Sequence, residues 1–143
     1  MDELSYTTTA TAWGGRMGRV ATSDGRLDYH LSMPEGMGGD GGDGTNPEQL
    51  FACGYAACFH NAVRSVARKL KVDVTDSAVS VTVHIAGTLA DGYRLSIRIE
   101  AELPGVQPDT ARQVLDAAHA RCPYSRALAG NHDLELVLVD GSN

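Results

Sequence analysis

The side chains with the greatest chemical potential in this sequence are three cysteines, Cys53, Cys58 and Cys122. A thiolate is a nucleophile and a metal ligand, whereas a neutral buried thiol behaves as a small apolar group. Because three is an odd number, a framework of permanent disulfides is not expected. We therefore expect any chemistry of these sulfurs to be redox, nucleophilic or metal-binding.

Cys58 lies inside the apolar run Leu50–Phe59. Burial raises the pKa of a thiol and makes it inert, so Cys58 taken alone is interpreted as core. A reactive Cys58 needs a cation brought to it from elsewhere in the fold, and arginine keeps its charge when it is desolvated. Arg16 and Arg19, which follow a pair of glycines, are the candidates.

Cys122 precedes Pro123, a residue favoured at the first position of a helix. Its sulfur is then expected at or near the helix N-cap, where free N–H groups and the helix dipole favour a thiolate. The alternative is a small apolar residue before a proline. Cys53 would point roughly 140° away from Cys58 on one helix, so these two sulfurs cannot bond. We interpret Cys53 as core filler.

Other kinds of site find less support in the sequence. The pairs His119-x-x-Cys122 and Cys58-x-His60 do not complete the spacing of a four-ligand zinc site. No G-x-S-x-G motif of a serine hydrolase is present. The segment Gly36–Gly44 has six glycines and two aspartates but lacks the spacing of a phosphate-binding loop. We expect it to be a mobile linker, and we expect no bound metal or cofactor.

A long helix should carry Cys58. Asn46 is a good N-cap, Pro47 suits the first helical position, and Gln49 is placed to close a capping box. The predicted helix runs from here to Leu70. Because its first half is apolar on nearly every face, it must be covered on all sides, which a single small sheet cannot do. A partner subunit could supply the missing cover.

Strands are predicted around this helix. Two Asp-Gly steps between alternating segments are typical of hairpins with two-residue type I′ turns. The predicted strands are Arg19–Thr22, Leu27–Ser32, Val79–Thr88 and Tyr93–Leu103, with further strands at Ser5–Trp13 and Leu134–Val139. Two more helices are expected at Pro108–Arg121 and from Pro123 to about Ala129.

Size and charge narrow the class of protein. A chain of 143 residues and 15.1 kDa predicts one domain over residues 1–143. The net charge of −6 without a basic cluster argues against a nucleic-acid partner. The acidic start is not followed by an apolar stretch, so we expect no secretory signal and a cytoplasmic protein. The longest apolar run is about half of the ~20 residues that span a membrane, so no membrane partner is expected.

The segment GTNPEQLFACGYAACF, Gly44–Phe59, resembles the active-site helix of organic hydroperoxide resistance (Ohr) proteins in the OsmC-like superfamily. The segments GGRMGR at Gly14–Arg19 and CPYSRALAGN at Cys122–Asn131 occur in the family's order, so the likeness covers nearly the whole chain. The resemblance implies an α+β fold in which a mostly antiparallel sheet wraps around a central apolar helix. It also implies an intertwined homodimer.

The resemblance further implies roles for four residues: Cys58 as the peroxidatic cysteine, Cys122 as the resolving cysteine, and Arg16 and Glu48 as their supporting charges. The implied activity is reduction of alkyl or fatty-acid hydroperoxides through a Cys58 sulfenic acid and a Cys58–Cys122 disulfide. The implied external reductant is dihydrolipoamide, free or on a lipoylated protein. One departure is Cys53, which stands where the family usually has alanine.

Helix geometry bears on how the charges would reach the sulfur. Glu48 and Cys58 would be roughly 15 Å apart on a continuous helix, too far for one arginine to bridge comfortably. We therefore expect Arg16 and Glu48 to reach Cys58 from the other chain of the dimer. Two alternatives are a redox-inactive, small-molecule-binding OsmC-like protein and a general thiol–disulfide oxidoreductase, although the C-x-x-C spacing usual for the latter is missing.

Overall fold

The structure is a computed structural model that describes residues 3–130 and 133–139. Its helices and mostly antiparallel strands confirm the predicted α+β class. The chain forms two compact units, Met1–Leu50 and Phe51–Asn143. The single domain expected over residues 1–143 stays a prediction.

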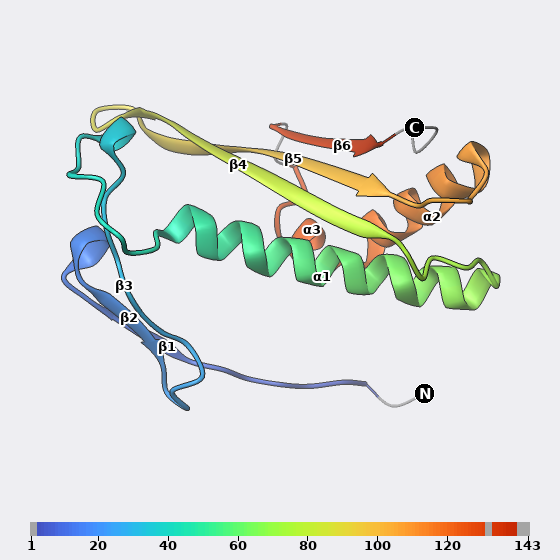
Figure 1. Ribbon diagram of the computed structural model, residues 1–143, viewed down its shortest axis with the longest axis horizontal. Coiled ribbons are helices and arrows are strands. Elements are labelled where there is room, and N and C mark those ends of the chain that lie inside the picture. The colour runs from blue at the N-terminus through green and yellow to red at the C-terminus, as the bar shows by residue number, and fades with distance from the viewer. Residues whose placement is uncertain (1–2, 131–132, 140–143) are drawn as a thin grey trace. The chain divides into compact units, whose positions relative to one another are not determined.

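The first unit is built on a three-stranded antiparallel sheet (Figure 1), whose strands are β1 (Ala10–Trp13), β2 (Arg19–Thr22) and β3 (Asp28–His30). The predicted strand Ser5–Trp13 is wrong over its first half, because only Ala10–Trp13 pairs with a neighbour. Leu31 is the one buried apolar residue of this unit within the described chain. The first unit therefore has no hydrophobic core of its own.

The second unit contains the sheet β4 (Ala78–Thr88), β5 (Gly92–Glu102) and β6 (Leu134–Leu138). The strands β4 and β5 form an antiparallel hairpin, whereas β6 pairs with β5 in parallel. A parallel neighbour requires a long crossover, and α2 (Pro108–Arg121) with α3 (Pro123–Ala127) provides it. Five of the predicted elements, the two hairpin strands, the two later helices and the last strand, are thereby confirmed to within a few residues.

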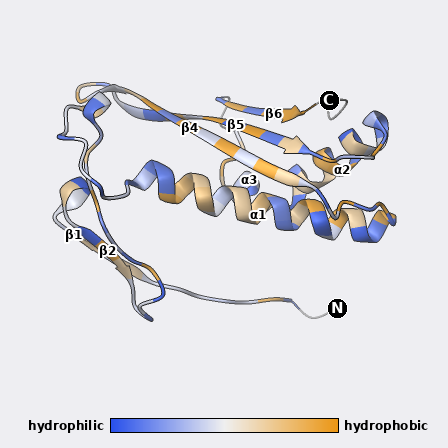
Figure 2. Ribbon diagram, in the orientation of Figure 1, coloured by the Kyte–Doolittle hydropathy of each residue, from blue (hydrophilic) through white to orange (hydrophobic). Residues whose placement is uncertain are grey.

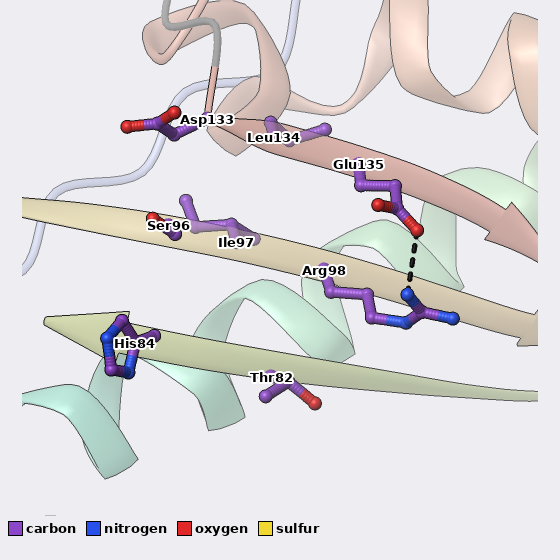
Figure 3. Close-up of a pocket in the computed structure, with 8 residues that line it drawn as sticks. All are labelled: Thr82, His84, Ser96, Ile97, Arg98, Asp133, Leu134 and Glu135. Carbon is purple, nitrogen blue, oxygen red and sulfur yellow. Dashed lines mark hydrogen bonds and ion pairs between the residues drawn. The ribbon is translucent and has the colours of Figure 1, made fainter.

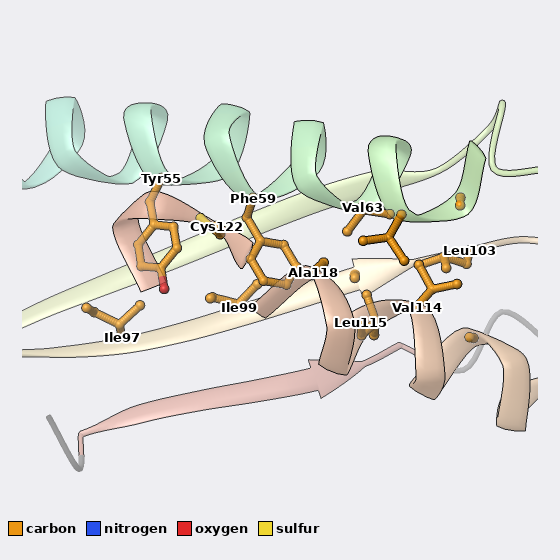
Figure 4. Close-up of a cluster of buried hydrophobic side chains, with 14 residues drawn as sticks. Tyr55, Phe59, Val63, Ile97, Ile99, Leu103, Val114, Leu115, Ala118 and Cys122 are labelled. Atoms are coloured by element: carbon orange, nitrogen blue, oxygen red, sulfur yellow. The ribbon is translucent and has the colours of Figure 1, made fainter. Parts of the chain in front are cut away.

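The core of the second unit lies between α1 (Pro47–Leu70), α2 and the sheet (Figure 4). Along β5, buried Ile97 and Ile99 alternate with exposed Arg98, as expected for a strand with one dry face. The same alternation is visible in the hydropathy colouring of β4 and β5 (Figure 2). The other large apolar side chains that are fully buried in this core are Tyr55, Phe59, Val63, Val114 and Leu115.

Both Asp-Gly turns are wider than predicted. A type I′ turn needs positive φ at both central residues, but only Gly25 (φ 74°) and Gly92 (φ 87°) have it, and neither aspartate does. Asp24 instead accepts hydrogen bonds from the N–H of Arg26 and the hydroxyl of Thr22. These local bonds of a short carboxylate stabilise a longer connection between the strands.

The start of α1 follows the sequence signals. The Oδ1 atom of Asn46 accepts the N–H of Gln49 at 2.8 Å, which confirms the predicted N-cap. The Gln49 side chain accepts a hydrogen bond from the Thr45 hydroxyl at 2.9 Å, so the reciprocal half of the capping box is not made with Asn46. The helix ends at Leu70 as predicted. Within the described residues, no helix combines the length and hydropathy that a membrane crossing needs.

Candidate active site

Two sulfurs meet in the core of the second unit. Cys58 lies on α1, and Cys122 is both the C-cap of α2 and the N-cap of α3, as predicted. The Cys122 thiol donates a weak hydrogen bond to the Cys58 sulfur across 3.6 Å. Because a disulfide bond is about 2.05 Å long, an approach of about 1.5 Å would join them. The chain therefore holds two free thiols in contact with each other.

The two thiols differ in access. Cys122 is fully buried, whereas Cys58 is partly exposed. Pro123 excludes helical backbone at Cys122, which is extended at φ −60° and ψ 124° and so directs the chain from α2 into α3. A reactant in solution therefore meets Cys58 before Cys122.

The surroundings of Cys58 shift the pKa of its thiol. Burial is the largest influence on the pKa of Cys58 and raises it. The backbone N–H of Tyr124 donates to the sulfur and lowers that pKa, while the neighbouring Cys122 sulfur raises it because two thiolates so close would repel. The net effect is a raised pKa, which keeps Cys58 mainly a neutral thiol at pH 7.

The interpretation of Cys53 as core filler is wrong for this chain. Cys53 is exposed, and so are Ala57 and Asn61, which lie four and eight residues further along α1. The residues of α1 that are buried in the core here are Tyr55 and Phe59. The helix therefore buries one stripe, and Cys53 lies on another.

The first unit holds the predicted charges together. Arg16 donates two hydrogen bonds to Glu48, at 2.8 Å to Oε2 and 2.6 Å to Oε1. The pair is mostly shielded, with 29% of the Arg16 side chain and 15% of the Glu48 side chain exposed. The bidentate geometry fixes the plane of the guanidinium. The bond to Arg16 is the largest influence on the pKa of Glu48 and lowers it.

Glycines place Arg16. It lies in the turn Gly15–Met17 between β1 and β2, where Gly14 and Gly15 have φ of 77° and 58°. A Cβ atom on Gly18 would lie 1.7 Å from the carbonyl oxygen of Trp13, so only glycine lets the chain pass there. The other candidate, Arg19, forms an exposed pair with Asp28 at 2.7 Å. Arg16 thus makes the more shielded of the two ion pairs.

The four predicted site residues therefore form two contacts. Cys58 touches Cys122 in the second unit, and Arg16 touches Glu48 in the first. Their roles in a reaction stay predictions.

Sequence reasoning missed Tyr55 and Ser125 beside the sulfurs, and it weighed His119 only as a metal ligand. The hydroxyl of Ser125 forms hydrogen bonds with the Tyr55 hydroxyl at 2.7 Å and with Nδ1 of His119 at 2.9 Å. Each lies three residues from a cysteine in sequence, a spacing that shares a helix face and could have pointed to them. His119, weighed as a metal ligand with Cys122, is engaged by Ser125. In the ranges that the structure describes, no group of three or more metal-binding side chains is found.

A hollow lies on the other, polar face of the second sheet (Figure 3). Its main charges pair with each other, since Arg98 donates to Glu135 at 2.7 Å. No cysteine lines it; the lining residues are Thr82, His84, Ser96, Ile97, Arg98, Asp133, Leu134 and Glu135. It is therefore separate from the dithiol.

The fold and the site together define an α+β protein with a close pair of free thiols on its central helix and the following helical crossover. Residues 39–137 match the family model described as OsmC-like protein. The chain is 43% identical to the organic hydroperoxide resistance protein of Xanthomonas axonopodis pv. citri, over 96% of this chain and 97% of that protein. It is 38% identical to the organic hydroperoxide resistance protein OhrB of Bacillus subtilis, over 93% of this chain and 97% of that one.

A solved structure agrees. The crystal structure of an organic hydroperoxide resistance protein from Legionella pneumophila aligns with a TM-score of 0.90 and 43% identity, over 96% of this chain and all of that one (100%). The chain therefore belongs to the OsmC-like family, alongside relatives named organic hydroperoxide resistance proteins, as its motifs predicted.

Proposed function

We propose that this protein is a thiol-dependent peroxidase that reduces organic hydroperoxides to alcohols. The observation that carries the proposal is the pair of sulfurs 3.6 Å apart, of which Cys58 is accessible and Cys122 is buried. That asymmetry suits a first thiol that meets the oxidant and a second that traps the product. The names of its relatives support the same substrate class.

The proposed reaction has two steps. The Cys58 thiolate attacks the distal oxygen of the hydroperoxide, the O–O bond breaks, and the alkoxide takes a proton and leaves as an alcohol. Cys58 is then a sulfenic acid. Cys122 attacks the Cys58 sulfur, the S–O bond breaks, water leaves, and a disulfide forms. The dithiol has supplied the two electrons that reduce the hydroperoxide.

Apolar surroundings favour a substrate with a hydrocarbon tail. The ring of Phe51 is only partly buried and lies seven residues before Cys58, about two helical turns away on the same side of α1. An alkyl or fatty-acid chain would gain burial energy against such a ring, about 0.8 kcal/mol per buried methylene, and hydrogen peroxide would not. We therefore propose alkyl or fatty-acid hydroperoxides as substrates.

We further propose that the working form is an intertwined homodimer in which the Arg16–Glu48 pair of one chain serves Cys58 of the other. The raised pKa of Cys58 supports this, because a thiol in that state needs a cation to ionise at neutral pH. The first unit supports it too, since large apolar side chains that should be covered are exposed there, among them Trp13, Leu27 and Tyr29.

Counting thiols tests the chemistry. Reduced protein treated with a slight excess of cumene hydroperoxide should rapidly lose two of its three free thiols, with Cys53 remaining. A redox-inactive binding protein would lose none, and that result would refute the peroxidase. Reduction of the oxidised protein should be much faster with dihydrolipoamide, the cytosolic dithiol we propose as the source of electrons, than with an equal concentration of glutathione.

Mixed dimers test the assembly. Alone, Cys58→Ser chains are expected to be inactive and Arg16→Gln chains to be at least about tenfold slower than wild type. If the arginine acts across the dimer, each mixed dimer has one complete site, so equal mixing should restore about a quarter of the wild-type rate for a two-fold symmetric dimer. If the arginine acts within one chain, mixing restores nothing. A fully active monomer in sedimentation would also refute the shared site.

A further inference from the structure

Three side chains from three helices form one hydrogen-bonded chain in the core beside the sulfurs. Tyr55 comes from α1, Ser125 from α3 and His119 from α2, with the Ser125 hydroxyl in the middle. Tyr55 is fully buried and Ser125 is 5% exposed. Buried polar groups are costly unless they are paired, so these hydrogen bonds favour the arrangement in which the three side chains meet.

The phenol of Tyr55 keeps its proton in this place. Burial is the main reason that the pKa of Tyr55 is raised, and the nearby sulfurs of Cys122 and Cys58 raise it further. Tyr55 therefore stays protonated. The Ser125 hydroxyl can donate to one of its two partners and accept from the other, so a single hydroxyl satisfies both contacts.

The spacing of these residues ties them to the cysteines. Tyr55 lies three residues before Cys58 on α1. Ser125 lies three residues after Cys122, and His119 three residues before it. The hydrogen-bonded chain thus connects α1, which carries Cys58, to α2 and α3, which meet at Cys122. In Figure 4 the Tyr55 ring extends from α1 on the same side as Cys122.

The α3 helix needs such an attachment. It has only five residues, too few for a helix to be stable without tertiary contacts. A close approach to α1 brings it in, since a Cβ atom on Gly54 would lie 2.7 Å from the Tyr124 hydroxyl. The bonds at Ser125 then fix α3 next to the turn of α1 that bears Cys58.

We propose that the Tyr55–Ser125–His119 chain is a positioning device that keeps Cys122 within reach of Cys58 and so sets how fast the disulfide closes. This inference rests on the proposed function for its biological meaning. A sulfenic acid at Cys58 either is captured by Cys122 or meets a second hydroperoxide, which adds an oxygen to the sulfur and leaves an irreversible sulfinic acid. Fast closure therefore protects Cys58 from over-oxidation.

The test separates the two steps in a single turnover. Tyr55→Phe and Ser125→Ala should consume hydroperoxide within about twofold of the wild-type rate, because neither removes a reacting atom. Disulfide formation should slow roughly two- to tenfold in Tyr55→Phe, the effect of one buried hydrogen bond, and more in Ser125→Ala, which loses two. Mass spectrometry should show more Cys58 sulfinic acid in both.

Ser77→Ala is the matched control. It removes the 2.9 Å hydrogen bond between Ser77 and Nε2 of His60, a serine–histidine pair in the same unit that does not involve α3. We expect both steps to stay at the wild-type rate. The double variant Tyr55→Phe with Ser125→Ala should close its disulfide no more slowly than Ser125→Ala alone, because the chain is already broken at its centre. Additive slowing would indicate general loosening of the core and would overturn the inference.

A second oxidant makes the inference independent of the peroxidase. Diamide takes the same two electrons from a dithiol without a hydroperoxide, so it reports the approach of the two sulfurs alone. Closure with diamide should be slowed in Ser125→Ala and unchanged in Ser77→Ala. Wild-type closure rates in both variants, with either oxidant, would overturn the positioning role. A wild-type protein that closes with diamide but ignores hydroperoxides would refute the proposed function only.

Discussion

The two units of the chain hold their important side chains in different ways. In the second unit, Cys122 belongs to a hydrophobic cluster, Cys58 packs against it, and every member of that cluster lies in this unit. In the first unit, Arg16 is placed by a glycine turn and by its ion pair with Glu48, and Leu31 is the one buried apolar residue in the described range.

The second unit fixes the distance between the two sulfurs, and the first unit fixes the orientation of a charged side chain. The second unit brings two sulfurs to 3.6 Å, yet the same burial raises the pKa of Cys58 and weakens it as a nucleophile. The first unit has a well-oriented guanidinium but no core to stabilise it. Packing thus positions the sulfurs in the second unit, whereas an ion pair holds the charge in the first.

The largest effect should come from the sulfurs themselves. Cys58→Ser removes the nucleophile with little change of shape, and hydroperoxide consumption should become undetectable in a coupled assay. Cys122→Ser should still react once and then stop, with Cys58 sulfenic acid as the product that dimedone labels. Cys53→Ser is the control and should retain wild-type turnover, because Cys53 lies on the exposed stripe. Turnover by Cys58→Ser would place the chemistry elsewhere.

The next largest effect is expected on the free energy of unfolding, from the core of the second unit. Phe59 is fully buried, and Phe59→Ala should lower the free energy of unfolding by about 3–5 kcal/mol, because the cavity it leaves cannot collapse fully. Leu89, in the β4–β5 hairpin, is 88% exposed, so Leu89→Ala should change the free energy by less than about 0.5 kcal/mol. Urea titration followed by circular dichroism measures both. Equal losses would contradict the assignment of the core.

A smaller effect is expected from the charge of the first unit. Under the proposed function, Arg16→Gln removes the cation that lowers the pKa of Cys58, a change of about one to three units. At pH 7 the rate with cumene hydroperoxide should fall roughly tenfold to a thousandfold, because only the thiolate reacts. The deficit should shrink as the pH rises toward 10, since the thiol of the variant then ionises without help.

Arg19→Gln is the matched control for that variant. Arg19 is three residues away and also pairs with a carboxylate, but its pair with Asp28 is exposed, and such pairs contribute little. Its rate should stay within about twofold of wild type between pH 6 and pH 10. If the two variants behaved alike, the distinction between the shielded and the exposed ion pair would have no functional meaning.

Local signals accounted for most of the fold. Asn46 and Pro47 predicted where α1 begins, and the alternation around Ile97 and Ile99 predicted β5, because capping and strand periodicity act over a few residues. The parallel pairing of β6 with β5 was not predicted, since it joins segments separated by two helices. The Asp-Gly turns were predicted too tight because neither aspartate takes positive φ. The Asp24 carboxylate accepts the backbone N–H of Arg26, and the Asp91 carboxylate accepts the hydroxyl of Thr88.

The site was predictable in part. Motifs named Cys58, Cys122, Arg16 and Glu48, and the structure adds which of them touch. Cys53 was misplaced because an apolar run does not say which side of a helix faces the core. The bonds made by Ser125 were invisible, since its partner Tyr55 is 70 residues away in sequence and only the packing of α3 on α1 brings them together.

The smallest effect should come from the turn that places Arg16. A Cβ atom at Gly18 would lie 1.7 Å from the Trp13 carbonyl oxygen, so Gly18→Ala must open the turn and displace the guanidinium while leaving its charge in the protein. Misplacement of a supporting group by about 1 Å can be costly, so the peroxidase rate at pH 7 should fall by roughly tenfold, less than in Arg16→Gln. Gly36→Ala is the control, since open space surrounds that position and its rate should not change. Equal rates in the two glycine variants would mean that the charge of Arg16 acts without being held in place. The way in which the first unit positions Arg16 would then have no effect on activity.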